Sequence, residues 1–90
     1  MGAIFEAIHD KLTAAFAPSR LEIEADSARH AGHAGASAAG ESHFNVVIEA
    51  QAFQGTTKVS RQRMVYRILA EELAGPLHAL SVKALAPGES

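Results

Sequence analysis

Histidines are the side chains of this sequence best suited to chemistry. Three of its five histidines hold positions that suit a ligand: His30, His33 and His78. Neutral imidazole is the commonest protein ligand for borderline metal ions. A complete zinc site needs four ligands, or three and a water molecule. These histidines and one acidic side chain could supply them. The alternative is a polar loop and a strand-end histidine that is hydrogen-bonded to backbone.

The lack of cysteine narrows the metal hypothesis. None of the 90 residues is Cys, so the chain offers no thiolate to zinc or to an iron–sulfur cluster. Two histidines can replace two thiolates on one iron of a two-iron cluster. A chain with histidines and no cysteine could therefore hold half of such a cluster. The pattern predicts a hetero-complex in which a partner brings the thiolates.

A group of cations forms the second candidate site. Its members are Lys58, Arg61, Arg63 and Arg67. We expect them at the start of a helix, where unpaired N–H groups and the helix dipole favour anions. Phosphate, a nucleic acid backbone or a peptide carboxylate such as that of glutathione would fit. The alternative is a solvated basic face in which Arg67 pairs with Glu71 four residues later.

Other classes of function find little support. The formal charge of −2 gives no overall case for nucleic acid, so such a function must rest on a local patch. The serines lack the glycine context of a nucleophile elbow, and we expect no enzyme. No apolar run approaches the ~20 residues of a membrane span. The N-terminus also lacks the basic region of a secretory signal. We expect a cytoplasmic protein that does not bind membranes.

Few elements are available to position these residues, because 90 residues make one small domain with a thin core. Apolar side chains recur at helical or alternating spacing. The spacing predicts helices over 3–16 and 60–74 and strands over 20–26, 43–51 and 79–85. Ser60 is the expected cap of the second helix, and Gly75-Pro76 ends it.

Residues 28–40 are rich in Gly, Ala and Ser and are predicted to form a flexible loop that carries His30 and His33. The strands on either side of this loop should pair as an antiparallel hairpin. Pro87 and Gly88 are expected to lead to a frayed end. The result is a single α+β domain over residues 1–90, ordered over about 3–86, with helices on one face of a three-stranded sheet.

Several motifs, in order and in register from Ile4 to Pro87, resemble the BolA family. They are Ala25-Asp26-Ser27 leading into Arg29-His30, Glu41-Ser42-His43-Phe44, Phe53-Gln54-Gly55, Arg61-Gln62-Arg63-Met64-Val65-Tyr66, Leu69-Ala70-Glu71-Glu72-Leu73 and Leu77-His78-Ala79-Leu80. The resemblance implies a class II KH-like fold without a working GxxG loop. The formal match Gly32-His33-Ala34-Gly35 falls between two strands, whereas the KH loop joins two helices.

The resemblance also implies a partner, a monothiol glutaredoxin. In such pairs a bridging 2Fe–2S cluster is held by the glutaredoxin's cysteine, a glutathione and histidines of the BolA-like protein. His78 matches one family ligand and His30 matches the second, with His33 as a possible substitute. The family has also been described as transcription regulators, with DNA contacts from the basic helix region, where Lys58, Arg61 and Arg63 would fall.

One departure from the family pattern concerns its usual Arg-His-Arg, which reads Arg61-Gln62-Arg63 here. Gln62 keeps hydrogen-bonding ability but cannot titrate near neutral pH or act as a typical metal ligand, so a role that needs this histidine stays open.

Two hypotheses about function follow from the sequence. The first is a non-catalytic iron–sulfur partner of a glutaredoxin in cluster assembly, trafficking or iron-linked regulation. The second is a DNA-binding transcriptional regulator.

Overall fold

The computed structural model describes residues 2–25, 43–75 and 77–89. The elements in chain order are α1 (Ala3–Phe16), β1 (Arg20–Ala25), β2 (His43–Glu49), the 3-10 turn η2 (Gln51–Phe53), α2 (Lys58–Ile68), α3 (Ala70–Ala74) and β3 (Ala79–Leu85). The predicted order of helices and strands is confirmed. The predicted loop over 28–40 lies outside the described residues.

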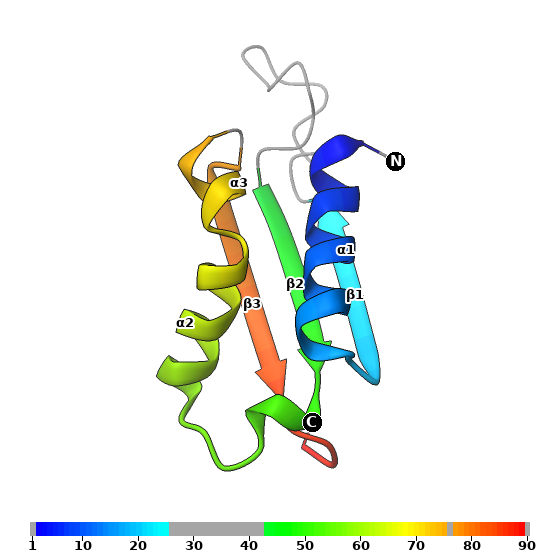
Figure 1. Cartoon of the computed structure of the whole chain (residues 1–90), viewed down its shortest axis with the longest axis vertical. Coiled ribbons are helices and arrows are strands. Elements are labelled where there is room, and N and C mark those ends of the chain that lie inside the picture. Colours follow the sequence, from blue (N-terminus) through cyan, green and yellow to red (C-terminus); the bar gives the residue numbers. More distant parts are fainter. Residues whose placement is uncertain (1, 26–42, 76, 90) are drawn as a thin grey trace.

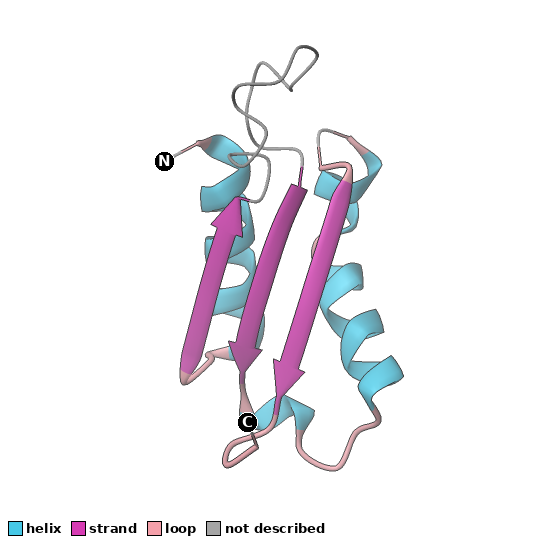
Figure 2. Cartoon of the chain, turned by 180° about the vertical axis from the view of Figure 1, so that it is seen from behind, coloured by secondary structure: helices cyan, strands magenta, loops and turns pink. Residues whose placement is uncertain are grey.

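The three strands form one sheet in the order β1-β2-β3. β1 pairs with β2 antiparallel, as predicted, and β3 pairs with β2 parallel. The helices cover one face of the sheet (Figure 1), and the other face is open when the chain is seen from behind (Figure 2). This confirms the predicted α+β architecture.

The core lies between the helices and the sheet, and the alternating strand pattern explains it. Inward side chains of the central strand β2 are almost fully buried, namely Phe44, Val46 and Ile48. Ile8 and Leu12 of α1 pack against them with no exposed surface, because their four-residue spacing puts them on one side of the helix. Within the described part of the chain, no helix has the length and apolar character to cross a membrane.

The second predicted helix differs from its prediction at its start and in its middle. It begins at Lys58, and its cap is Thr57, whose side chain accepts a hydrogen bond from the backbone N–H of Ser60 at 3.1 Å. Ser60 is therefore inside the helix. The helix breaks at Leu69, a fully buried residue with φ −100° and ψ 20°, so that α2 and α3 are separate. Gly75 follows α3 at the predicted stop.

The connection from β2 to α2 is part of the core. Phe53, at the end of η2, has no exposed surface, and its ring centroid lies 5.1 Å from that of Phe16. The contact joins the end of α1 to the chain segment that leads into α2. The alternation that predicts the strands gives no signal for this residue, because a single aromatic in a turn has no periodicity.

Residues 86–89 form a turn, so the predicted frayed end is wrong. The N–H of Glu89 donates to the carbonyl of Ala86 at 3.0 Å. Pro87 and Gly88 fill the two central positions, and Gly88 has φ +91°, which is the pattern of a type II turn. The N–H of Gly88 also donates to Oε2 of Glu49 at 3.2 Å. The turn thereby brings Glu89 back over the start of α2.

Candidate functional site

One end of the sheet carries two exposed histidines. His78 directly precedes β3, and His43 is the first residue of β2. In the parallel pairing, His43 is the partner of Ala79, the residue next to His78. Neighbouring strands lie about 4.8 Å apart, so the backbones of His43 and His78 lie close together at the same sheet end.

His78 is held in place by the residues around it. Leu77 is buried, and its N–H donates to the carbonyl of Glu72 at 3.0 Å, which closes the turn after α3. Ala79 begins the strand ladder with β2. The histidine therefore lies between two fixed backbone positions with its side chain exposed, at the mouth of β3 where the sequence places it.

The other two candidate ligands, His30 and His33, lie outside the described residues. The segment that carries them leaves the sheet at Ala25 and returns at His43. Ala25 pairs with Phe44, so both ends of this segment meet the sheet at the end that carries His43 and His78. Among the side chains that the structure describes, no three of His, Asp or Glu are grouped closely enough to hold a metal ion.

His43 is a residue that the sequence reasoning did not single out as a site. The alternation of apolar and polar residues along this strand predicts that His43 faces outward. The sequence alone does not tell which strand pairs with β3, or whether the pairing is parallel or antiparallel. The parallel register with β3 is what brings His43 beside His78.

The predicted cation group divides into two parts in the structure. Lys58, Arg63 and Arg67 are exposed on α2. Two large apolar side chains of the same helix are also exposed, Val59 at 61% and Tyr66 at 39%. Glu71, the predicted partner of Arg67, lies beyond the break at Leu69, and its Oε1 is 2.8 Å from Nζ of Lys11 on α1.

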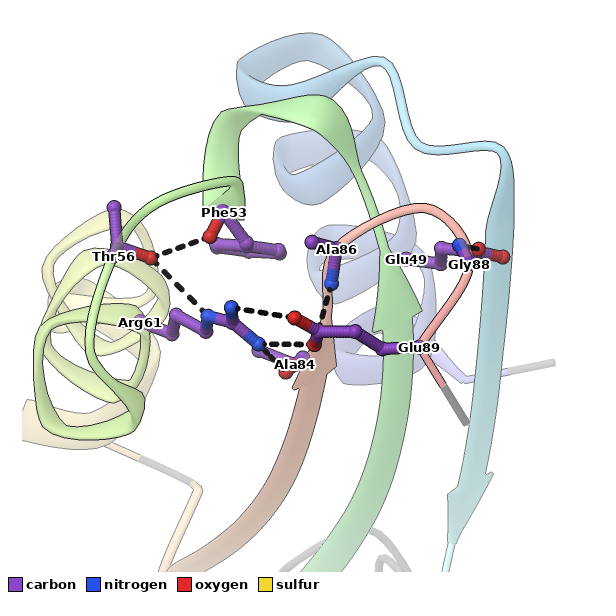
Figure 3. Close-up of polar contacts among 8 residues, drawn as sticks. All are labelled: Glu49, Phe53, Thr56, Arg61, Ala84, Ala86, Gly88 and Glu89. Carbon is purple, nitrogen blue, oxygen red and sulfur yellow. Dashed lines mark hydrogen bonds and ion pairs between the residues drawn. The ribbon is translucent and has the colours of Figure 1, made fainter.

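Arg61, the fourth cation, points into the protein and is only 5% exposed (Figure 3). Its Nη1 lies 2.6 Å from Oε1 of Glu89, and its Nη2 donates to Oε2 of the same carboxylate at 3.1 Å. Nη1 also donates to the carbonyl of Ala84 at 3.0 Å, and Nε donates to Oγ1 of Thr56 at 3.1 Å. We expected an exposed anion-binding residue, whereas this guanidinium joins α2, β3 and the turn 86–89.

The hydrogen bonds around Glu89 favour the ionised form of its carboxyl group. The hydrogen bond from Arg61, followed by that from the backbone N–H of Ala86, lowers the pKa of Glu89 from 4.5 to about 2. The same carboxylate raises the pKa of Arg61. The pair is therefore fully charged at neutral pH.

Polar side chains of α2 satisfy carbonyls along β3, which is an edge strand. Gln62 donates to the carbonyl of Val82, and the hydroxyl of Tyr66 donates to that of Leu80 at 2.7 Å. Together with the bond from Arg61 to Ala84, every second carbonyl from Leu80 to Ala84 accepts a side-chain donor. Position 62 therefore belongs to the contact between α2 and β3, and the glutamine side chain retains a donor there.

Comparisons with known proteins agree with this architecture. A profile of the BolA family, described as BolA-like protein, matches residues 12–89. SufE-like protein 1 of Arabidopsis thaliana is 44% identical over 86 residues, which are 91% of this chain and 23% of that protein. The DNA-binding transcriptional regulator BolA of Escherichia coli is 46% identical over 79 residues, which are 88% of this chain and 71% of that protein.

A solved structure of the BolA domain of SufE1 from Arabidopsis thaliana superimposes with a TM-score of 0.85 at 42% identity, over 100% of this chain and 99% of that domain. The chain thus has the length of that domain, although it spans less than a quarter of the SufE-like protein itself. The family profile covers residues 12–89 and the shared fold covers the whole chain, so the chain belongs to the BolA family.

Proposed function

We propose that this chain is a non-catalytic partner of a monothiol glutaredoxin and shares a bridging 2Fe–2S cluster with it and with glutathione. The observation that carries the proposal is the exposed His78, beside His43, at the sheet end where the segment with His30 and His33 leaves and returns. The proposed ligands of this chain are His78 and His30, with His33 or His43 as substitutes for the second.

The donor set fits half of such a cluster. Imidazoles can replace thiolates on one iron, and the sequence holds no cysteine for the other. A bound cluster would supply a redox-active iron–sulfur unit that can be passed to another protein. This chain's own contribution is to fix His78 between Leu77 and Ala79 while leaving its ring open to a partner.

We propose that the protein performs this function in the cytoplasm and that it does not bind membranes. The SufE-like relative from Arabidopsis thaliana differs in this respect, since its name assigns that protein to chloroplasts and mitochondria. The outputs we propose are assembly or trafficking of clusters, or regulation linked to iron.

The test is anaerobic reconstitution of this chain with a monothiol glutaredoxin and glutathione. Visible absorption and circular dichroism should show a hetero-complex whose spectrum differs from that of the glutaredoxin alone. His78→Ala should abolish this difference because it removes a ligand. His9→Ala is the matched control, since His9 is exposed on α1 beside Asp10, and its spectrum should equal that of the wild type.

Three further variants identify the second ligand: His30→Ala, His33→Ala and His43→Ala. The one that changes the spectrum as His78→Ala does is the second ligand. If His78→Ala leaves the hetero-complex spectrum unchanged, the assignment of this histidine is wrong.

A DNA-binding regulator is the second candidate function. It is supported by the exposed cations Lys58, Arg63 and Arg67 on α2 and by the name of the Escherichia coli relative. Each neutralised phosphate changes log K by about 0.9 per unit of log salt concentration. Arg63→Ala with Arg67→Ala should therefore reduce that slope by about 1.8 in titrations of duplex DNA.

The control for the DNA experiment is Arg20→Ala, which removes an arginine from β1 that already pairs with Glu22 at 2.6 Å. It should leave the slope unchanged. Equal slopes for the wild type and the α2 double variant would rule out this helix as the DNA contact.

A further inference from the structure

The contact between Arg61 and Glu89 has the geometry by which proteins bind carboxylate or phosphate ligands. Two nitrogens of the guanidinium face the two oxygens of one carboxylate, at 2.6 Å and 3.1 Å. The backbone N–H of Ala86 adds a third donor to Oε1 at 3.0 Å. Figure 3 shows the carboxylate of Glu89 between these groups.

The guanidinium is held by groups other than Glu89. The hydroxyl of Thr56 accepts from Nε and itself donates to the carbonyl of Phe53 at 2.7 Å. The carbonyl of Ala84 accepts from Nη1. Removal of the Glu89 side chain would therefore leave a positioned arginine with two nitrogens directed at the vacated place.

The surroundings of Arg61 favour a small anion. An open groove of about 710 Å³ runs between the start of α2 and β3, and its charged lining residues are Lys58, Arg61, Lys83 and Glu89. This volume is in the range of small-molecule sites. Cations outnumber anions in the groove, and the side chain of Glu89 is 45% exposed, so solvent reaches the ion pair.

We propose that Arg61 is an oxyanion-binding site that the protein's own Glu89 occupies in this structure, and that external carboxylate or phosphate groups compete with Glu89 for it. The site lies at the far end of β3 from His78. Seven strand residues separate the two, or about 20 Å. It is therefore distinct from the proposed cluster site and does not depend on it.

The pKa of Glu89 supports the strength of this site. Arg61 and the N–H of Ala86 lower it to about 2, which means that the site prefers a negative charge to a neutral group. An external oxyanion that takes the place of the Glu89 carboxylate meets the same donors. The turn 86–89 acts as an intramolecular competitor, since its carboxylate is always present at high effective concentration.

The experiment titrates the full chain with inorganic phosphate and, separately, with acetate. Two-dimensional NMR follows the Nε–H of Arg61 and the backbone N–H of Ala86. In Glu89→Ala, both signals should shift in a saturable way, with a dissociation constant at least tenfold lower than in the wild type. Saturation by phosphate alone, by acetate alone or by both identifies the class of oxyanion that the site takes.

Glu22→Ala is the matched control, because it also removes the carboxylate partner of an arginine. Arg20, the arginine freed by that change, is exposed on β1. Its anion affinity gives the baseline for an adventitious ion. In the double variant Arg61→Met with Glu89→Ala, the N–H of Ala86 should lose its saturable shift, and the NMR spectrum reports directly whether this variant is folded.

If the methionine variant does not fold, Arg61→Lys with Glu89→Ala replaces it and should bind more weakly than Glu89→Ala alone, since lysine lacks the two-pronged geometry. The proposal is wrong if Glu89→Ala binds no more tightly than the wild type. It is also wrong if its affinity equals that of Glu22→Ala, which would mean an adventitious ion only.

Discussion

Phe53→Ala is expected to lower the free energy of unfolding by about 3–5 kcal/mol, the usual cost of deleting a buried phenyl ring. Small domains have only about 5–15 kcal/mol of stability in total, so this one change puts the fold at risk. Phe53 has no exposed surface and packs against Phe16, so removal of its ring leaves a cavity in the core. Urea unfolding followed by circular dichroism measures the loss.

The matched control is Val59→Ala, six residues after Phe53. Val59 is 61% exposed, so its truncation should change the unfolding free energy by less than about 0.5 kcal/mol. Phe53→Leu should recover most of the loss because it refills most of the cavity. Equal effects of Phe53→Ala and Val59→Ala would show that the contact with Phe16 does not stabilise the fold.

The sequence predicts the sheet and the first helix well because their patterns repeat. Leu21 and Ile23 alternate with Glu22 and Glu24, and in the structure the two apolar side chains are partly buried while the two glutamates are exposed, as this period requires. The start of the second helix is predicted less well. Thr57 and Ser60 are both good caps, and only the backbone conformation of Thr57, with ψ 160°, decides between them.

The sequence predicts those parts of the candidate site that depend on residue type and local order. It does not predict the parts that depend on strand pairing or on contacts between distant residues. His78 follows a clear helix stop, so its place at the start of a strand can be read from the sequence. The position of His43 beside it depends on the parallel register of β3, which is a long-range property. The burial of Arg61 was also unpredictable, because its partner Glu89 is 28 residues away.

Arg61→Ala should reduce stability several times more than Arg63→Ala, although the two arginines are two residues apart on one helix. Arg61 is 5% exposed and binds Glu89, Ala84 and Thr56, whereas Arg63 is exposed. Truncation of Arg61 leaves these polar groups without their donor, which is the costly case for buried hydrogen bonds. Urea unfolding of both variants at neutral pH measures the difference. Equal losses would mean that the inward contacts of Arg61 do not stabilise the fold.

The part of this effect that belongs to the ion pair should depend on pH in one direction. The pKa of Glu89 is lowered on folding, so the carboxylate contributes its full stabilisation above about pH 4.5 and loses it as the pH falls towards 2. A double-mutant cycle between Arg61→Ala and Glu89→Ala isolates the pair. Its coupling energy should be constant from pH 7 to about 5 and then decrease on acidification. The bonds from Arg61 to Ala84 and Thr56 hold no titrating group, so the remaining loss in Arg61→Ala should persist at low pH. A coupling that stayed constant down to pH 2 would show that the negative charge of Glu89 is not what holds the turn 86–89 against α2.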